Sequence, residues 1–249
     1  MAPAPRCELV QSAGLRHAEH MTMRTSSPAE PPRGQAVLAE LRQALAPSVP
    51  RTVPADRIMS GIEPLDAALC GGLPAGRLVE LCGNAGRMTL ALALVASALE
   101  RGPCAFIDAV DGLDVDAAEA VGVDLSRLLW ARVRSAEDAL RGADLLLRAG
   151  GFALLVLYLC GAPPPRLGLG TWPRLVQRAQ HEGTALLVAS DEPVSGSAAC
   201  ATLHCERTRG RWMPAPGGRW LLRGQEATLS VLRSRLGPPP PPATLVFER

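Results

Sequence analysis

Lysine is absent from this chain of 249 residues, so arginine supplies all 26 of its basic side chains. Because 24 acidic residues leave a formal net charge of +2, the composition provides no general attraction to nucleic acid or acidic membranes. Aromatic residues make up only 3% of the sequence, and leucine, valine and alanine must therefore build most of the core. No run approaches the ~20 apolar residues of a membrane span, and the first residues lack a secretion signal. These absences predict a cytoplasmic protein, with association with the nucleoid left open.

The seven cysteines show no paired spacing of the kind that indicates a disulfide framework. Cys82, Cys104 and Cys160 lie in or beside apolar runs, which is typical of buried, reduced thiols. Cys200 and Cys205, with a histidine beside the second, are too few for a zinc site without another cluster. The sequence therefore predicts no metal site.

Composition divides the chain into three parts. Residues 1–33 are rich in proline, alanine, serine and arginine without periodicity, which predicts a flexible segment. Residues 34–56 form a short helix and a proline-rich linker, and residues 57–249 form the core. The helix is expected over residues 35–45, where the apolar side chains follow helical spacing: Val37, Leu38, Leu41 and Leu45.

Strands and helices alternate through the first part of the core. The expected strands cover residues 77–82, 104–109, 128–133, 152–159 and 184–190. The expected helices cover residues 62–69, 87–101, 115–121, 136–149 and 172–182. This alternation predicts an α/β fold with a mostly parallel sheet flanked by helices. After residue 190 the alternation stops, and short strands are expected at residues 201–212, 219–222, 227–235 and 244–248. We expect these last strands to extend one edge of the sheet in antiparallel fashion.

A glycine-containing turn joins the first core strand to the next helix. It consists of Gly83, Asn84, Ala85, Gly86, Arg87, Met88 and Thr89. A phosphate-binding loop has the pattern G-x-x-x-x-G-K-[ST], in which lysine reaches the phosphates and the hydroxyl holds Mg²⁺. Here the glycines are two residues too close, arginine replaces lysine, and a methionine, which does not bind Mg²⁺, replaces the hydroxyl. The turn therefore predicts a degenerate nucleotide loop; an ordinary turn that never bound phosphate is the alternative.

Several motifs resemble the RecA ATPase core and stand in the same order. Residues 60–69, SGIEPLDAAL, and 71–81, GGLPAGRLVEL, resemble the entry to that core. Residues 105–109, 121–125 and 231–239 resemble later motifs of the same family. The resemblance spans about residues 57–248 and implies a RecA-like fold with a P-loop core.

Within this superfamily the chain resembles the ImuA family, accessory proteins of bacterial damage-induced mutagenesis that are associated with the polymerase-like partner ImuB. The match rests on total length, on the short N-terminal helix and on the degenerate core. It implies a non-catalytic adaptor that supports error-prone translesion synthesis by binding an ImuB-type protein and RecA. Two alternatives stay open: a SulA-like inhibitor of cell division, and a DNA-dependent ATPase with an atypical loop.

The resemblance also implies that three catalytic positions are lost. Val110 stands where the RecA family has the acid that orients the attacking water, and Tyr158 stands where it has the aspartate that helps to hold Mg²⁺. Asp191 replaces a glutamine that senses the nucleotide. Because hydrolysis needs the metal, the phosphate cradle and a placed water together, we expect a pseudo-ATPase without a cofactor. Weak ATP binding stays open, since a helix N-terminus attracts anions.

Two further regions are candidate contact surfaces. Residues 161–171 and 192–199 stand where RecA proteins have their DNA-binding loops. Both segments are short and together contain a single basic residue, Arg166, so we expect DNA binding to be weak. Arginine and tryptophan gather instead in the C-terminal strands: Arg207, Arg209, Arg211, Trp212, Arg219, Trp220 and Arg223. The first three alternate and are expected on one strand face. This composition suits a protein interface or base stacking. The helix at residues 35–45 is the other candidate, as a docking element for RecA.

Overall fold

The computed structural model describes residues 57–165 and 170–248. The strands are β1 (Arg57–Ile58), β2 (Leu73–Pro74), β3 (Leu78–Gly83), β4 (Cys104–Asp108), β5 (Leu128–Arg132), β6 (Leu154–Tyr158), β7 (Ala185–Ala189), β8 (Ala201–Ala215), β9 (Arg219–Ser234) and β10 (Ala243–Glu248). The helices are α2 (Glu63–Ala68), α3 (Arg87–Leu99), α4 (Val115–Ala120), α5 (Ala136–Ala149) and α6 (Thr171–Glu182), with short 3₁₀ turns η1 (Leu125–Arg127) and η2 (Gly196–Ala198). The expected helix with Val37, Leu38, Leu41 and Leu45 lies outside the described residues.

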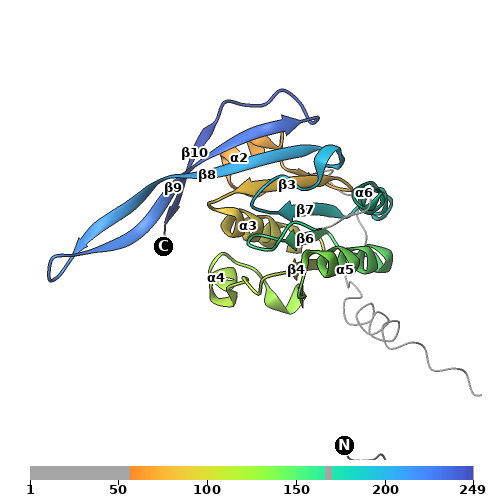
Figure 1. Ribbon diagram of the computed structural model, residues 1–249, viewed down its shortest axis with the longest axis horizontal. Helices are drawn as coiled ribbons and strands as arrows, with labels where there is room; N and C mark the ends of the chain where they lie inside the picture. Colours follow the sequence, from red (N-terminus) through yellow and green to blue (C-terminus); the bar gives the residue numbers. More distant parts are fainter. Residues whose placement is uncertain (1–56, 166–169, 249) are drawn as a thin grey trace, which may run out of the picture.

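One sheet of eight strands organises the protein, in the order β10-β9-β8-β3-β7-β6-β4-β5 (Figure 1). The six strands from β8 to β5 run parallel to one another, and β9 and β10 are antiparallel to their neighbours. This confirms the predicted α/β class, with a mostly parallel sheet and antiparallel C-terminal strands. Within the described residues, no helix has both the length and the apolar character that crossing a membrane requires.

The core lies on both faces of the sheet, because successive side chains of each central strand point to opposite sides. In β6, Leu154 and Val156 join the core under α3, whereas Leu155 and Leu157 join the core under α5 and α6. All four side chains are fully buried. A strand covered on both faces needs a continuous apolar run, which is why this segment shows no polar alternation.

The helices and strands of the parallel part lie within two residues of their predicted ends. The C-terminal part needs two corrections. Residues 219–222 and 227–235 are not separate strands but parts of β9, because Gly224 between them is paired with both neighbouring strands. The first C-terminal strand, β8, is parallel to β3 rather than antiparallel. Pairing with neighbours overrides the turn-like composition of residues 223–226.

The hairpin of β8 and β9 extends beyond the sheet. Strand β3 pairs with β8 only as far as Cys205, and β10 pairs with β9 only from Gly224 onwards. Residues 212–222 therefore pair only within the hairpin, and the ribbon projects away from the body of the protein (Figure 1). We call residues 206–226 the arm.

Gly83, at the end of β3, offers a test of the close packing between β3 and β8. Its φ is +118°, and an added β-carbon would lie within 3.0 Å of three backbone atoms of Cys205. We expect Gly83→Ala to lower the free energy of unfolding by more than about 2 kcal/mol, because the backbone must shift. Gly61→Ala is the matched control, since Gly61 has a φ of +76° but no atom within 4 Å of the added carbon. Urea denaturation of both variants measures the difference, and equal losses would contradict the packing argument.

Candidate functional site

The glycine turn lies at the carboxyl ends of the parallel strands, where the sequence motifs placed the site. The turn between β3 and α3 is only three residues long, because β3 ends at Gly83 and α3 begins at Arg87. Arg87 contacts Asp191 after β7, and it also lies close enough to Tyr158 at the end of β6 for its charge to oppose the rise in the pKa of Tyr158 that burial causes. The structure therefore brings these three predicted positions together.

Val110 and Asp108 lie beside Tyr158, because Asp108 is opposite Tyr158 in the sheet and a β-carbon added to Gly112 would lie 3.3 Å from the side chains of both Val110 and Tyr158. Val110 follows β4, with a side chain that is 38% exposed. Asp108 is fully buried, and its carboxylate accepts hydrogen bonds from the N–H groups of Val110 (3.1 Å) and Leu113 (3.0 Å). Asp111 has a φ of +56° and lies 3.6 Å from Arg132 across an exposed ion pair. The carboxylate of Asp108 thus fixes the turn after β4.

The first three backbone N–H groups of the glycine turn donate to protein carbonyls. Gly83 N–H donates to the carbonyl of Asp191 (3.0 Å), and those of Asn84 (3.0 Å) and Ala85 (3.3 Å) both donate to Cys205. The Asn84 side chain also accepts a hydrogen bond from the N–H of Arg207 (2.8 Å). In an anion-binding loop such N–H groups face the ligand. Here strand β8 takes that place.

A ring from the last strand covers the second glycine of the turn. Gly86 has a φ of +66°, and an added β-carbon would lie within 3.0 Å of two ring carbons of Phe247. Phe247 belongs to β10, whose antiparallel pairing with β9 brings it over the start of α3. Glycine is needed here for two reasons: the left-handed backbone and the close approach of the ring.

Arg87 joins the turn to the ends of two strands. Its guanidinium donates to the carbonyl of Ser190 (3.0 Å) and forms an ion pair with Asp191. The other carboxylate oxygen of Asp191 accepts from the N–H of Gly161 (2.6 Å), beyond β6. Burial raises the pKa of Asp191, but the hydrogen bonds from Arg87 and Gly161 outweigh it and lower the pKa below 3.8. Arg87 is therefore engaged within the protein.

Tyr158 and Cys160 lie at the same carboxyl edge of the sheet, and both side chains are uncharged at neutral pH. The Tyr158 ring stacks on Phe106 at 5.7 Å between centroids. Burial, followed by the neighbouring Cys160, raises the pKa of Tyr158 well above its usual 10. Burial also raises the pKa of Cys160 to about 11, although the charge of Arg87 opposes this shift. Neither group supplies the anionic oxygen that Mg²⁺ prefers. In the part of the chain that the structure describes, no three histidine, cysteine, aspartate or glutamate side chains are grouped to hold a metal.

Glu80 is the residue that sequence reasoning missed. It is fully buried in the middle of β3 and accepts hydrogen bonds from the N–H groups of Val194 (2.6 Å) and Ser195 (2.9 Å). The hydroxyls of Ser195 (2.8 Å) and Thr202 (3.4 Å) donate to its other oxygen. The signal was present in the sequence, since a glutamate inside an apolar strand must find partners. These hydrogen bonds hold the loop at residues 192–199 against β3. This loop is one of the two positions where the DNA-binding loops were expected.

The arm carries the arginine and tryptophan residues, although not all on the face that was expected. Arg207 lies opposite Ala227, but Arg209 lies opposite the adjacent Glu226, so the register shifts by one residue between them. Directly opposed residues share a face of an antiparallel ribbon. The prediction of one common face is therefore wrong: Arg209 and Arg211 share a face and Arg207 lies on the other, because a bulge reverses the alternation.

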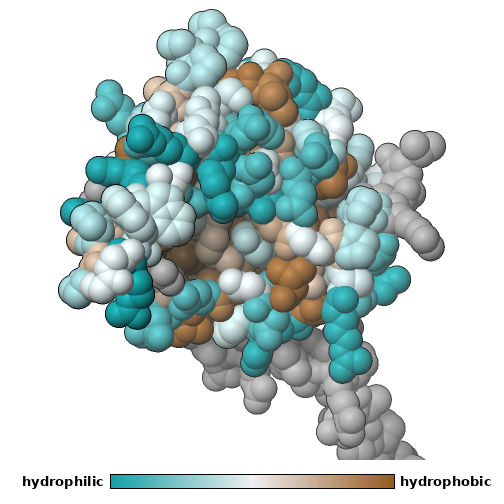
Figure 2. All heavy atoms as spheres, turned by 60° about the vertical axis from the view of Figure 1, so that its left-hand side comes forward, coloured by the Kyte–Doolittle hydropathy of each residue, from teal (hydrophilic) through white to brown (hydrophobic). Residues whose placement is uncertain are grey.

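The outer part of the arm exposes large apolar side chains. Trp212 is 59% exposed, Trp220 is 64% exposed and Leu221 is 55% exposed, and Arg219 and Arg223 are exposed beside them. Figure 2, in which this end faces the viewer, shows hydrophilic and apolar residues interspersed on the surface. Tryptophan, leucine and arginine on a ribbon without a covering layer are typical of a contact surface.

A parallel sheet with a glycine turn between a central strand and its helix, and with the polar groups gathered at the carboxyl ends of the strands, defines the class of P-loop α/β proteins. The model of the RecA N-terminal domain matches residues 46–170, about half of the chain. The chain therefore belongs to the RecA family.

Relatives in this family are RecA proteins from several bacteria. The chain is 38% identical over 149 residues to Protein RecA of Methylococcus capsulatus, covering 55% of this chain and 43% of that protein. It is 44% identical over 118 residues to Protein RecA of Acidiphilium cryptum, covering 46% of this chain and 34% of the relative. The chain thus spans less than half the length of these relatives.

A solved structure supports the same fold. The crystal structure of the RadB recombinase matches with a TM-score of 0.58 over 75% of this chain and 94% of that one. At 20% identity, this likeness shows the architecture alone.

The ion pair between Arg87 and Asp191 predicts a pH dependence of stability. Because the pKa of Asp191 is lowered below 3.8 by folding, its stabilising contribution is present above pH 3.8 and is lost as pH falls through the lowered value. We expect Asp191→Asn to lower the free energy of unfolding by about 1 kcal/mol at pH 7, with a smaller difference at pH 3. Thermal unfolding at both pH values measures this.

Asp111→Asn is the matched control, since Asp111 forms an exposed ion pair at 3.6 Å with Arg132. We expect a change below about 0.5 kcal/mol for this variant. A loss at pH 7 that is equal for the two variants would contradict the structural role of Asp191.

Proposed function

We propose that this protein is a non-catalytic, RecA-like adaptor of the bacterial DNA-damage response. It supports error-prone translesion synthesis by binding an ImuB-type polymerase-like partner and RecA. Membership in the RecA family is the result on which the proposal builds. The narrower assignment to the ImuA family rests on total length, on the expected short N-terminal helix and on the degenerate core.

The proposal rests on the observation that groups of the glycine turn are bonded to other parts of the protein. The N–H groups of Gly83, Asn84 and Ala85 donate to the carbonyls of Asp191 and Cys205, and the cation of the turn, Arg87, is paired with Asp191. Phe247 packs on Gly86 at the start of α3. Phosphoryl transfer depends on placing the phosphates, the metal and the water together. A turn whose first three N–H groups and whose cation are bonded within the protein supports a structural role instead of hydrolysis.

Weak nucleotide binding is compatible with this proposal. Helix α3 begins at Arg87 after a glycine N-cap that provides no side-chain hydrogen bond. The positive end of such a helix attracts anions. ATP would then compete with Asp191 for Arg87, and we expect low affinity without turnover.

Phosphate release from ATP tests the absence of hydrolysis. We expect no release above the no-enzyme background, with or without single-stranded DNA, while a RecA from a bacterial relative serves as the positive control. Arg87→Ala should leave the result unchanged. Turnover by the wild-type protein that disappears in Arg87→Ala would establish the DNA-dependent ATPase and end the adaptor proposal.

The arm is the surface we assign to the protein partner. Its exposed tryptophans and arginines are the residue types that dominate the binding energy of protein interfaces. DNA is a weaker candidate for this surface, because the arm also carries Glu206 and Glu226 and its arginines are divided between two faces.

Binding to purified ImuB-type protein and to RecA tests the role of the arm. We expect Trp212→Ala with Trp220→Ala to weaken binding to at least one of them by about tenfold or more, since a buried tryptophan contributes 2 kcal/mol or more to many interfaces. Leu145→Ala on α5 is the matched control, because Leu145 is 50% exposed but lies outside the arm. Wild-type binding to the tubulin-like division protein alone would support the SulA-like alternative instead.

A further inference from the structure

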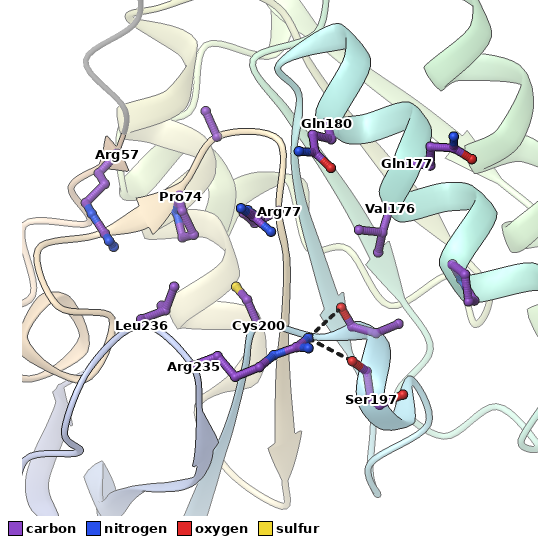
Figure 3. Close-up of a pocket in the computed structure, with 13 residues that line it drawn as sticks. Arg57, Pro74, Arg77, Val176, Gln177, Gln180, Ser197, Cys200, Arg235 and Leu236 are labelled. Atoms are coloured by element: carbon purple, nitrogen blue, oxygen red, sulfur yellow. Dashed lines mark hydrogen bonds between the residues drawn. The ribbon is translucent and has the colours of Figure 1, made fainter.

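A second concave site lies at the opposite end of the sheet from the glycine turn. Its cavity of about 720 Å³ opens beside the residues that precede β3 and β8 and follow β9, and α6 forms one wall. Figure 3 shows Arg77 near its centre, with Pro74 on one side, Val176 on the other and Cys200 on the floor. The function proposed above uses none of these residues.

Three arginines from different segments line this cavity: Arg57, Arg77 and Arg235. Backbone carbonyls hold two of them in place. Arg57 donates to the carbonyls of Leu69 (2.8 Å) and Gly72 (3.3 Å). Arg235 donates to those of Ser197 (2.7 Å) and Ala199 (2.8 Å), and Figure 3 shows its guanidinium reaching the η2 turn. Such carbonyls orient a guanidinium without neutralising its charge.

The positive charge of the cavity has no acidic counterpart in the described part of the chain. No aspartate or glutamate is among the lining residues. The ion pairs that form within residues 57–165 and 170–248 involve none of the three arginines. Burial raises the pKa of Cys200, while the charges of Arg77 and Arg235 act in the opposite direction, which places both cations near the cavity floor. The side chain of Arg77 is exposed toward solvent.

The rest of the lining favours a peptide over a nucleic acid. Val176, Leu236 and Pro74 provide apolar walls, and Gln177 and Gln180 of α6 provide amide groups that both donate and accept hydrogen bonds. Phe, Tyr and Trp are missing from the lining residues that the structure describes, so bases would find no ring on which to stack. Arginine binds carboxylates with a forked geometry, and apolar walls suit the side chains between them.

We propose that this cavity binds a short acidic peptide segment of a partner protein, with a carboxylate on Arg77 and neighbouring apolar side chains against Val176 and Leu236. The site is separate from both the glycine turn and the arm. Its occupancy is therefore independent of whether the protein hydrolyses nucleotide or binds a polymerase-like partner.

Fluorescence anisotropy with the full chain tests this proposal. The probe is a labelled six-residue peptide of alternating glutamate and leucine, compared with the same peptide carrying glutamine for glutamate. We expect the glutamine peptide to bind at least about tenfold more weakly, since each charge-assisted hydrogen bond contributes more than a neutral one. Equal binding of the two peptides, or no binding of either, would overturn the proposal.

Three variants localise the binding. Arg77→Ala should weaken binding of the acidic peptide about tenfold, and Gln180→Glu should weaken it as well by placing a negative charge in the cavity. Arg134→Ala is the matched control, because Arg134 is an exposed arginine between β5 and α5, at the other edge of the sheet. It should change binding less than about twofold. If Arg77→Ala binds the acidic peptide as tightly as the wild type does, the proposed site is wrong.

Competition experiments with the bound acidic peptide distinguish it from two other negatively charged ligands, phosphate and nucleic acid. Neither inorganic phosphate at millimolar concentration nor a single-stranded oligonucleotide should displace the acidic peptide. Displacement by phosphate would make the cavity a small-anion site, and displacement by the oligonucleotide that depends on Arg77 would make it a nucleic-acid site. Either outcome would replace the peptide proposal.

Discussion

The ion pair between Arg87 and Asp191 is the interaction around which the carboxyl edge of the sheet is arranged. Through it the start of α3 is tied to the residues after β7, and the hydrogen bond from Gly161 adds the end of β6. A buried N–H or a cation must find a partner, and in this turn the partners are the protein's own carbonyls and one carboxylate. Three N–H groups and the cation of the turn are therefore bonded within the protein, and this supports the proposed adaptor role.

The same constraint explains why other segments converge on this edge. Strand β8 pairs with β3 as far as Cys205, whose carbonyl meets the turn, and β10 returns along β9 to place Phe247 over Gly86. Glu80, buried in β3, fixes the loop that follows β7 through two N–H groups and a serine hydroxyl. The surfaces that stay open to partners lie elsewhere, on the arm and at the opposite end of the sheet.

Much of the fold could be predicted because apolar periodicity and glycine turns are local signals. Strands β3 to β7 and helices α2 to α6 were located within two residues, and the alternation of strands and helices predicted their α/β class. The two-residue strands β1 and β2 were missed, because such short segments carry no periodicity. The glycine turn was recognised from its residue pattern, whereas the loss of a magnesium ligand at Tyr158 is a prediction from the RecA resemblance. The sequence held no signal that Arg87 would bond to Asp191, since 104 residues separate them.

The order of apolar and polar residues by itself determined that both faces of the sheet are covered and where the turn lies. The residue types of the turn showed that the usual side chains of a phosphate loop are missing. These features depend only on neighbours along the chain. Only the tertiary structure decided where the turn's N–H groups donate, that a bulge separates Arg207 from Arg209, and that Arg57, Arg77 and Arg235 share one cavity. Those features depend on strand register and on contacts between distant segments. Register is set by pairing across the sheet rather than by local preference.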